Sequence, residues 1–494
     1  MHRKWWTLLA TCVATFMLLL DITIVNVALP EIQRDLDASF SDLQWVVDAY
    51  SLSLAGLLLA AGSLGDRLGR RRIFVWGFAI FTAASLLCGL ATNPTFLNLS
   101  RVLQGVGGAA MFATTLSLIA QEFQGPERAT AFGIWGATIG GAVAIGPLVG
   151  GALTDALGWE WIFFVNVPIG IAAIALTLSK VGESRIPAAE PVDWPGVVTF
   201  SASQFLLVFA LVRGNAEGWS SFLITGSLVA AAVLLLAFLA IQHRSSHPML
   251  DLHLFRKPAF VGVSIVAFSL SASMFAMFLY ITIYMQDILG LEPLEAGVKL
   301  LPITLLSFFV APVAGQLLTR VPARVFFGLG LGLTGVGLLL MGGISADSEW
   351  TTLLAGFLIA GAGIGMINPA IASVAVGVVS AAKAGMGSGI NNTFRQVGIA
   401  TGIAGLGAVF QHGIETRLAE DVPGAPSELG EAVASSGSRA MDGQGPEAVE
   451  AARDAFVGSL NELFLIAGIV ALVGALLGAL LTRDRDLVPH SPES

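Results

Sequence analysis

Charged residues are scarce in this sequence of 494 residues. Asp, Glu, Lys and Arg together make up 12% of it, whereas soluble globular proteins contain roughly 25%. Hydrophobic residues make up 55%, and long uncharged runs place such residues in lipid rather than in water. The formal net charge of −9 matters less than where each charge falls along the chain. The composition therefore excludes an ordinary soluble domain and predicts a membrane protein.

Residues and motifs that hold metals or nucleotides are also scarce. The two cysteines, Cys12 and Cys88, lie in apolar runs, so we expect buried thiols and neither a zinc site nor a disulfide framework. The six histidines lie outside the apolar runs and form no HExxH pattern. Glycine-rich strings inside apolar runs have no preceding strand, and no phosphate-binding lysine loop exists. We therefore expect no enzyme activity and no metal, cofactor, nucleotide or nucleic acid.

The apolar residues form fourteen runs, each close to the roughly 20 residues that a spanning helix needs. The first run is too long for a secretory leader and continues to Pro30, so we expect it to be retained as a helix. The predicted spans are residues 7–29, 44–65, 73–92, 96–120, 129–153, 161–179, 194–213, 220–241, 259–283, 296–318, 324–343, 351–373, 389–411 and 458–481.

Basic residues are distributed unevenly between the connections. Alternate connections hold most of the 25 Lys and Arg residues, including Arg3, Lys4 and the run Arg70–Arg72. Such residues favour the cytoplasmic side of a membrane. We therefore predict a multi-pass protein of the cell membrane with both termini in the cytoplasm.

The longest connection, residues 412–457, contains more acidic than basic residues and many Gly, Ser and Pro residues. A solvated, partly disordered outer loop explains this composition. The alternative is a weak attractant for cations at the outer mouth.

The chain also repeats itself. The segment Gly62–Arg71 after the second predicted span resembles Gly315–Arg324 after the tenth, and a GxG pattern at residues 105–107 recurs at 361–363. We therefore predict an all-α membrane protein of two six-helix bundles with an inserted helix pair, and a substrate site between the bundles. The predicted divisions are residues 1–180, the inserted pair at 181–250, the second bundle at 251–481 and a tail at 482–494.

The first predicted span carries a carboxylate within the motif LDITIVNVALP, residues 20–30. Asp21 lies in an apolar setting, where an acidic residue is costly and normally faces the bundle interior. Asn26, five positions on, flanks it. The alternative is a structural Asp21 that holds this helix to its neighbours by hydrogen bonds.

The fourth and fifth predicted spans carry two further motifs. Arg101 opens RVLQGVGGAA, and an arginine inside a span needs an anionic or carbonyl partner. Phe357 stands at the equivalent place in the repeat, so the fold does not demand this charge. The fifth span contains GAVAIGPLVGG, in which glycines allow close packing and Pro147 bends the helix. These candidate hinge residues are Gly141, Gly146, Pro147, Gly150 and Gly151; a generic packing face is the alternative.

These motifs, with GSLGDRLGRRR at residues 62–72, resemble the major facilitator superfamily and its fourteen-helix branch of drug:proton antiporters, over all predicted spans. The resemblance implies that GSLGDRLGRRR forms a cytoplasmic latch. In this latch Asp66 lies at a neighbouring helix N-terminus, and Arg67 and Arg71 pair with carboxylates. The arginines could instead serve only to set topology. The repeat has Thr319 for Asp66, which weakens any second latch. The implied gate residues are Gly62, Gly65, Asp66, Arg67, Gly69, Arg70 and Arg71.

The resemblance also implies roles for other polar residues. We expect proton coupling at Asp21 and Arg101, with Asp48 as a further carboxylate or a solvated vestibule residue. Arg395 could line the cavity or simply snorkel. The residues expected in a substrate cavity are Asn26, Gln104, Asn166, Asn391, Asn392 and Arg395.

Without a nucleotide site, transport energy must come from a gradient. We predict a proton-coupled antiporter that exports small hydrophobic or cationic compounds by alternating access. Its expected partners are protons, a small-molecule substrate and lipid, and we expect a monomer. An exporter of one endogenous metabolite or lipid would carry the same motifs. A non-transporting sensor or scaffold should carry a signalling domain, and only thirteen residues are expected after Leu481.

Overall fold

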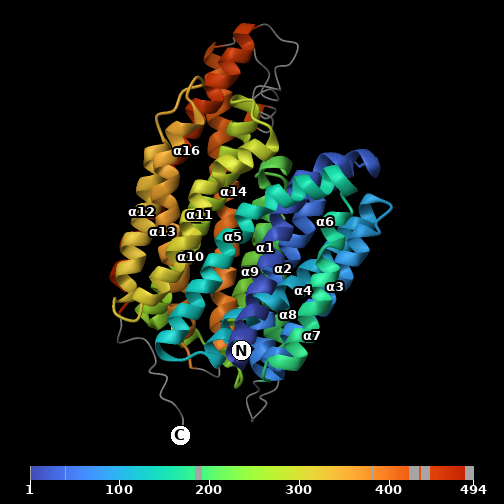
Figure 1. The fold of residues 1–494 in the computed structure, drawn as a ribbon, viewed down its shortest axis with the longest axis vertical. Coiled ribbons are helices and arrows are strands. Elements are labelled where there is room, and N and C mark those ends of the chain that lie inside the picture. Colours follow the sequence, from blue (N-terminus) through green and yellow to red (C-terminus); the bar gives the residue numbers. More distant parts are fainter. Residues whose placement is uncertain are drawn as a thin grey trace.

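The structure is a computed structural model that describes residues 2–38, 40–183, 192–380, 383–421, 433–434 and 446–483. All regular elements in these ranges are helical, and none is a strand. Figure 1 shows the long helices running side by side along one direction. The helices up to the middle of the chain are α1 (Arg3–Asp35), α2 (Phe40–Leu68), α3 (Arg70–Gly89), α4 (Pro94–Glu122), α5 (Gly125–Leu157), α6 (Trp161–Phe164), α7 (Asn166–Lys180), α8 (Trp194–Glu217) and α9 (Phe222–Arg244).

The second part of the chain is also helical. Its long helices are α10 (Pro258–Ile283), α11 (Pro293–Leu317), α12 (Ala323–Met341), α13 (Leu354–Gly377), α14 (Ala384–Asp421) and α16 (Pro446–Leu481). Short helical segments are η1 (Leu252–Arg256), η2 (Tyr284–Ile288) and η3 (Trp350–Leu353). In the described residues, 13 helices are long and apolar enough to cross a membrane, or 14 if the bent α5 counts as one span.

The helices pack in two groups. In the first, α2 packs on α4, α4 on α3, and α7 on α3; in the second, α12 packs on α13 and α16, and α10 on α14 and α16. The two groups meet where α5 packs on α11 and α2 on α14. Figure 1 shows the early helices, in blue and cyan, beside the late ones, in yellow to red. The pair α8 and α9 packs against α2 and α14 through α8.

Each group has its own apolar interior. One cluster of buried side chains is built largely from α10 to α16. Two further clusters are built largely from α1 to α7. Most of the apolar burial therefore lies inside one group or the other, and a few side chains of α2, α13 and α14 join the groups.

The helix pair α8 and α9 is fixed at one end by a polar residue. Asp193 caps α8 by accepting from the Gly196 amide at 3.0 Å. Its other oxygen accepts from Gln242 of α9 at 2.7 Å. One carboxylate therefore both starts α8, as N-cap residues do, and joins it to its partner helix.

Two predicted elements differ from the structure. The sixth predicted span is divided into α6 and α7, with a turn at Val165. The outer loop predicted at residues 412–457 is shorter at both ends, because α14 continues to Asp421 and α16 begins at Pro446. Charged residues ended the apolar runs in the sequence, but a helix that leaves the lipid can continue in water. The middle of that predicted loop lies outside the described residues, apart from 433–434.

The fifth predicted span is bent, as its proline suggested. Its arms Gly125–Val143 and Leu148–Leu157 meet at 46°. Proline at position 147 has no amide hydrogen to donate to the Val143 carbonyl, so the helix lacks a backbone hydrogen bond at that turn. The bend therefore falls in the GAVAIGPLVGG motif.

Candidate functional site

A buried ion pair lies inside the first group of helices. Arg101 of α4 donates through Nη1 to Oδ2 of Asp21 in α1, at 2.5 Å. Both residues are 1% exposed. The sequence left open whether these residues touch, and the structure brings them together across 80 positions of the chain. A charge in an apolar span persists only beside a partner or in a wet cavity, and each of these two charges has the other.

Polar groups from three further places complete the ion pair. Gln104 donates through Nε2 to the second oxygen of Asp21 at 2.8 Å, and its own Oε1 accepts from Arg101 at 2.6 Å. The Nε of Arg101 donates to the carbonyl of Val46 in α2 at 2.9 Å. Ser85 of α3 accepts from Gln104 at 2.9 Å. The cluster thus joins α1, α2, α3 and α4 through a single network.

Aromatic rings close the cluster. The Arg101 guanidinium lies 4.3 Å from the centre of the Tyr50 ring and 5.7 Å from that of Phe163. The Tyr50 hydroxyl is buried and has no hydrogen-bond partner in the structure. The cluster therefore uses the ring of Tyr50 but not its hydroxyl.

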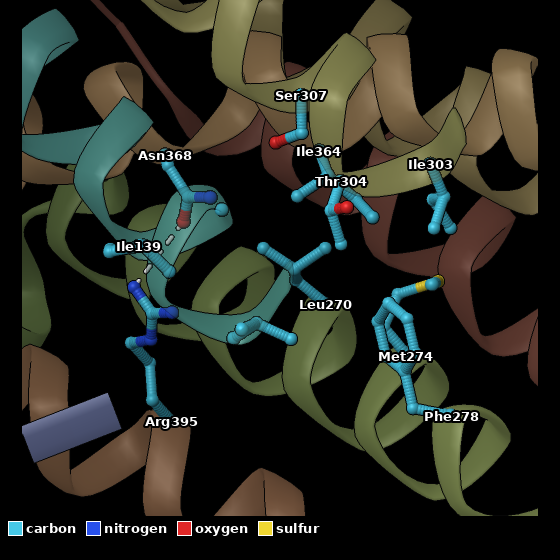
Figure 2. Close-up of a pocket in the computed structure, with 12 residues that line it drawn as sticks. Ile139, Leu270, Met274, Phe278, Ile303, Thr304, Ser307, Ile364, Asn368 and Arg395 are labelled. Atoms are coloured by element: carbon cyan, nitrogen blue, oxygen red, sulfur yellow. Dashed lines mark hydrogen bonds between the residues drawn. The ribbon is translucent and has the colours of Figure 1, made fainter. Parts of the chain in front are cut away.

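A separate pocket lies between the two groups of helices. Its polar side chains are Thr304 and Ser307 of α11, Asn368 of α13 and Arg395 of α14. Figure 2 shows Arg395 directed toward Asn368, to which it donates at 3.4 Å, with Leu270 across the space. The remaining lining is Ile139, Gly140, Val143, Leu270, Met274, Phe278, Ile303 and Ile364. The pocket holds about 50 Å³, so a drug-sized molecule requires the helices around it to separate further.

Most residues expected in a substrate cavity do not line this pocket. Arg395 lines it, but Gln104, Asn166, Asn391 and Asn392 do not. Gln104 is used in the Asp21 cluster, and the other three are buried among packed helices. The motifs named these residues, but the direction of each side chain depends on how the helices pack. The side chain of Asn26 lies outside the described residues.

Asn368 was missed by the sequence analysis. It lies in the apolar run MINPA of α13, next to Pro369. An amide inside a span is as costly as other buried polar groups. A single polar residue inside an apolar run is the signal that would have identified it.

The GSLGDRLGRRR motif lies where the two groups meet. Asp66 accepts from the backbone amides of Gly385 at 2.9 Å and Met386 at 2.8 Å, in the first turn of α14. It also pairs with Arg70 at 2.8 Å. The structure therefore places Asp66 at a neighbouring helix N-terminus, where unpaired amides and the helix dipole favour an anion.

The arginines of this motif have different partners. Arg70 forms an ion pair with Asp66. Arg67 donates to the backbone carbonyl of His247 at 3.1 Å, and Arg71 donates to that of Val181 at 3.0 Å. Gly69, with φ 112°, turns the chain between α2 and α3, so Arg70 at the start of α3 lies against Asp66 near the end of α2.

Backbones approach closely at the same end of the molecule. A side chain at Gly62 of α2 would collide with the Gly385 carbonyl of α14. A Cβ on Gly133 of α5 would lie 3.3 Å from Cα of Gly315 in α11. Gly65 leaves room for Thr114, and Gly69 has φ 112°, a conformation that favours glycine. This end is closed by glycines that face one another.

The hinge motif is used unevenly. Gly146 and Gly150 allow α5 to approach α1, since side chains there would meet Thr23 and Ile24. Gly151 faces open space, and a Cβ on Gly141 would make only ordinary contact at 3.5 Å with Phe308. Close packing against α1 therefore rests on two of the five predicted positions. The side chain of Pro147 lies outside the described residues.

Asp48 has a basic partner at the opposite end of α2. It lies 3.8 Å from Arg213 of α8. Arg213 also donates to Gln44 at 2.7 Å and to Glu217 at 3.1 Å. Asp48 is therefore a member of a polar cluster between α2 and α8, which is built from other side chains than the Asp21 network.

Comparisons with known proteins agree with this architecture. Residues 11–403 match the family described as the Major Facilitator Superfamily. The chain is 33% identical to the tetracenomycin C resistance and export protein of Streptomyces glaucescens, over 99% of this chain and 94% of that protein. It is 37% identical to the multidrug resistance protein Stp of Mycobacterium tuberculosis, over 83% of this chain and 77% of that one.

A solved structure shares the fold. The proton:xylose symporter XylE matches with a TM-score of 0.64 and 12% identity, over 97% of this chain and 96% of that chain. At this identity the match shows the fold alone. The family match covers most of the chain and the relatives extend over nearly all of it, so this multi-pass membrane protein belongs to the major facilitator superfamily.

Proposed function

We propose that the protein exports small hydrophobic molecules across the cell membrane in exchange for protons. The observation that carries the proposal is the Asp21–Arg101–Gln104 cluster, a carboxylate and its counter-ion held inside a bundle. The relatives named for multidrug resistance and for tetracenomycin C export support the direction of transport. The relatives support export, and the cluster supplies the argument for proton coupling.

Asp21 is the group proposed to take up the proton. In the structure it is paired with Arg101. Protonation would remove the ionic attraction between α1 and α4 and leave Arg101 held by the Val46 carbonyl and Gln104. The two helices then have a different preferred packing, which is what a coupled transporter needs from its proton site.

Asp21 is proposed to act on the substrate at a distance. It is 1% exposed and does not line the pocket. A direct exchange of proton for substrate on the same carboxylate would require contact with the cavity. The geometry instead favours coupling through the positions of helices.

The closed end is proposed as the cytoplasmic gate. Asp66, Arg70 and the start of α14 join the two groups there, and α5 crosses α11 at Gly133 and Gly315. Opening this end would break the Asp66 contacts, and the bend in α5 would serve as a hinge. Such rocking of one bundle against the other is alternating access.

The proposed organisation has fourteen spans, with residues 1–180 and 251–481 as bundles and 181–250 as an inserted pair. Both termini are placed in the cytoplasm on the basis of the basic residues in the sequence. Exposed positions allow a test. Cysteines introduced at Ser246 and Ser345 should react with an impermeant reagent from opposite sides of the membrane, since we place Ser246 inside and Ser345 outside. Labelling of both from one side would contradict the topology.

A panel of compounds in everted membrane vesicles tests the function. Wild-type vesicles energised by respiration should accumulate hydrophobic probes, and an uncoupler should abolish the accumulation. Vesicles from cells without the protein are the control. Accumulation that survives the uncoupler would contradict proton coupling, and no accumulation of any probe would contradict export.

An exporter dedicated to a single compound is the second candidate. The observation that favours it is the relative named for tetracenomycin C alone, which matches over nearly the full length of both chains. The same panel separates the two candidates, because a dedicated exporter would accumulate one chemical scaffold.

A further inference from the structure

The central pocket contains a buried cation and no acidic residue. Among its twelve lining residues, Arg395 is the only one with a formal charge, and no Asp or Glu is present. Arg395 is 7% exposed. Its side-chain bond in the structure is to the neutral amide of Asn368, at a long 3.4 Å. In the described part of the chain, no carboxylate forms an ion pair with it.

The helices that line the pocket cannot supply a carboxylate nearby. The sequences of α10 and α13 contain no Asp or Glu. In α14 the acidic residues begin at Glu415, twenty positions after Arg395, or about 30 Å along the helix. In α11 the acidic residue is Glu295, which already holds Lys299 at 2.6 Å, and in α5 they are Glu127 and Asp155, near the two ends.

Arg395 is too far from the helix end to escape into water there. It is the twelfth residue of α14, which begins at Ala384, so it lies roughly 16 Å from that start. The start of α14 is occupied by Asp66 in the closed end. Snorkelling, one of the two readings of this residue in the sequence, therefore does not account for its place in the pocket.

Other donors face the same space. The Ser307 hydroxyl is buried and has no partner, although it lines the pocket. Figure 2 shows Arg395 and Asn368 on one side of the pocket and the apolar side chains of Leu270, Met274 and Phe278 on another. The lining thus combines a cationic group, neutral hydrogen-bonding groups and an apolar wall.

We propose that this pocket binds amphiphilic anions, with the carboxylate or similar acidic oxygen group of the cargo paired to Arg395 and its ring system against Leu270, Met274 and Phe278. The inference rests on the proposed export function and names its substrate class. An unpaired charge is costly in a membrane protein, and a cargo anion supplies the missing partner. Cationic cargo, expected from the sequence, would meet repulsion and no carboxylate in this pocket.

The test compares cargo molecules that differ in charge. Everted vesicles containing the full-length protein are energised by respiration and supplied with methoxycoumarin carboxylate, its neutral carboxamide, or ethidium as a cation. Wild type, Arg395→Gln, Arg395→Lys and Arg417→Gln are compared at equal amounts in the membrane. Arg417→Gln removes another arginine of α14, which lies outside the pocket and pairs with Glu462, and it is the matched control.

We expect wild type to accumulate the carboxylate better than the carboxamide or ethidium. Arg395→Gln should lower carboxylate accumulation about tenfold or more and leave the carboxamide nearly unchanged, which shows that the variant is folded. Arg395→Lys should retain part of the preference, because a point charge replaces a planar fork incompletely. Arg417→Gln should retain the preference, because a partly exposed ion pair outside the pocket contributes little.

Three results would overturn the inference. Ethidium accumulated better than the carboxylate by wild type would reject the substrate class while export itself stands. Equal carboxylate accumulation by wild type and Arg395→Gln would reject the role of Arg395. If Arg395→Gln loses all three probes equally, Arg395 serves folding or movement rather than charge selection. Failure of wild type to accumulate any probe would instead contradict the proposed export function, and the inference with it.

Discussion

Arg101 and Arg395 are both buried in helices, with exposures of 1% and 7%, but their surroundings differ. Arg101 has a carboxylate at 2.5 Å, a backbone carbonyl and two aromatic rings. Arg395 has the amide of Asn368 and an open space. The first region neutralises its own charge, whereas the second leaves a charge for another molecule to neutralise.

The repeat makes this comparison informative. The α13 counterpart of Arg101 is Phe357, and α5, which corresponds to α14, has Arg128 near its first turn as its sole arginine. Neither buried arginine is thus required by the architecture that the halves share. Each half carries one buried arginine that its counterpart lacks, and our two proposals therefore place the proton and the cargo in different bundles.

The largest effect is expected from removing the carboxylate of Asp21, which neutralises Arg101 in the first region. Asp21→Asn should abolish proton-driven accumulation, which at 100 mV corresponds to roughly a fifty-fold gradient per charge. It also leaves Arg101 buried without its counter-ion, so the free energy of unfolding should fall by about 3–5 kcal/mol. Vesicle uptake measures the first effect, and thermal unfolding of the purified protein measures the second.

A double variant separates stability from coupling. Asp21→Asn combined with Arg101→Gln removes both charges and should recover much of the lost stability, but no gradient. If Asp21→Asn accumulates cargo as steeply as wild type, Asp21 is structural, and the coupling group lies elsewhere.

A smaller effect is expected at Asp66, where the two groups of helices meet. Asp66→Asn keeps the shape of the side chain but removes the negative charge at the start of α14. A charge at a partly buried helix end is worth about 1–2 kcal/mol, so the ratio of closed to open states should shift by about five- to thirtyfold. The maximal rate of vesicle uptake should fall more than the apparent affinity.

The matched control for Asp66 is Asp251→Asn. Asp251 pairs with Lys383 at 3.2 Å near the same end, but both side chains are partly exposed, and such pairs contribute little. An Asp66→Asn variant with altered affinity and an unchanged maximal rate would argue against a gate.

The smallest effect is expected at the cluster between α2 and α8. Asp48→Asn removes a carboxylate whose partner Arg213 still has Glu217 and Gln44. Accumulation in vesicles should stay within about twofold of wild type, because the remaining partners satisfy the arginine. A loss as large as that of Asp21→Asn would place proton coupling in both clusters and end the contrast between the two arginines.

The sequence predicted the helical architecture well, for a physical reason. A lipid core demands about 20 apolar residues per helix, so each span is visible as a run. The bend of α5 at Gly146 and Pro147 follows from proline chemistry in the same way. The ends were less visible, because α14 and α16 continue beyond the apolar residues that signalled them.

The site was less predictable because it depends on contacts between distant helices. Asp21 and Arg101 could be identified from the sequence, because charged residues are rare in spans. The sequence around these two residues could not show that Gln104 bonds to both of them. Nor could it show that Arg395 lacks an anion, since this depends on five different helices around the pocket. Asp66 was placed more readily, because a carboxylate beside a helix start follows from backbone chemistry.

The glycines that face each other at the closed end offer a way to trap the protein in another conformation. Because Gly62 meets the backbone of Gly385, and Gly133 that of Gly315, the seal is formed by main chain against main chain. A single methyl group added at Gly385 would collide with the Gly62 carbonyl and would push α2 and α14 apart, as a steric wedge. We expect such a variant to hold this end apart, and so to offer the opened conformer to antibodies or to a crystal lattice.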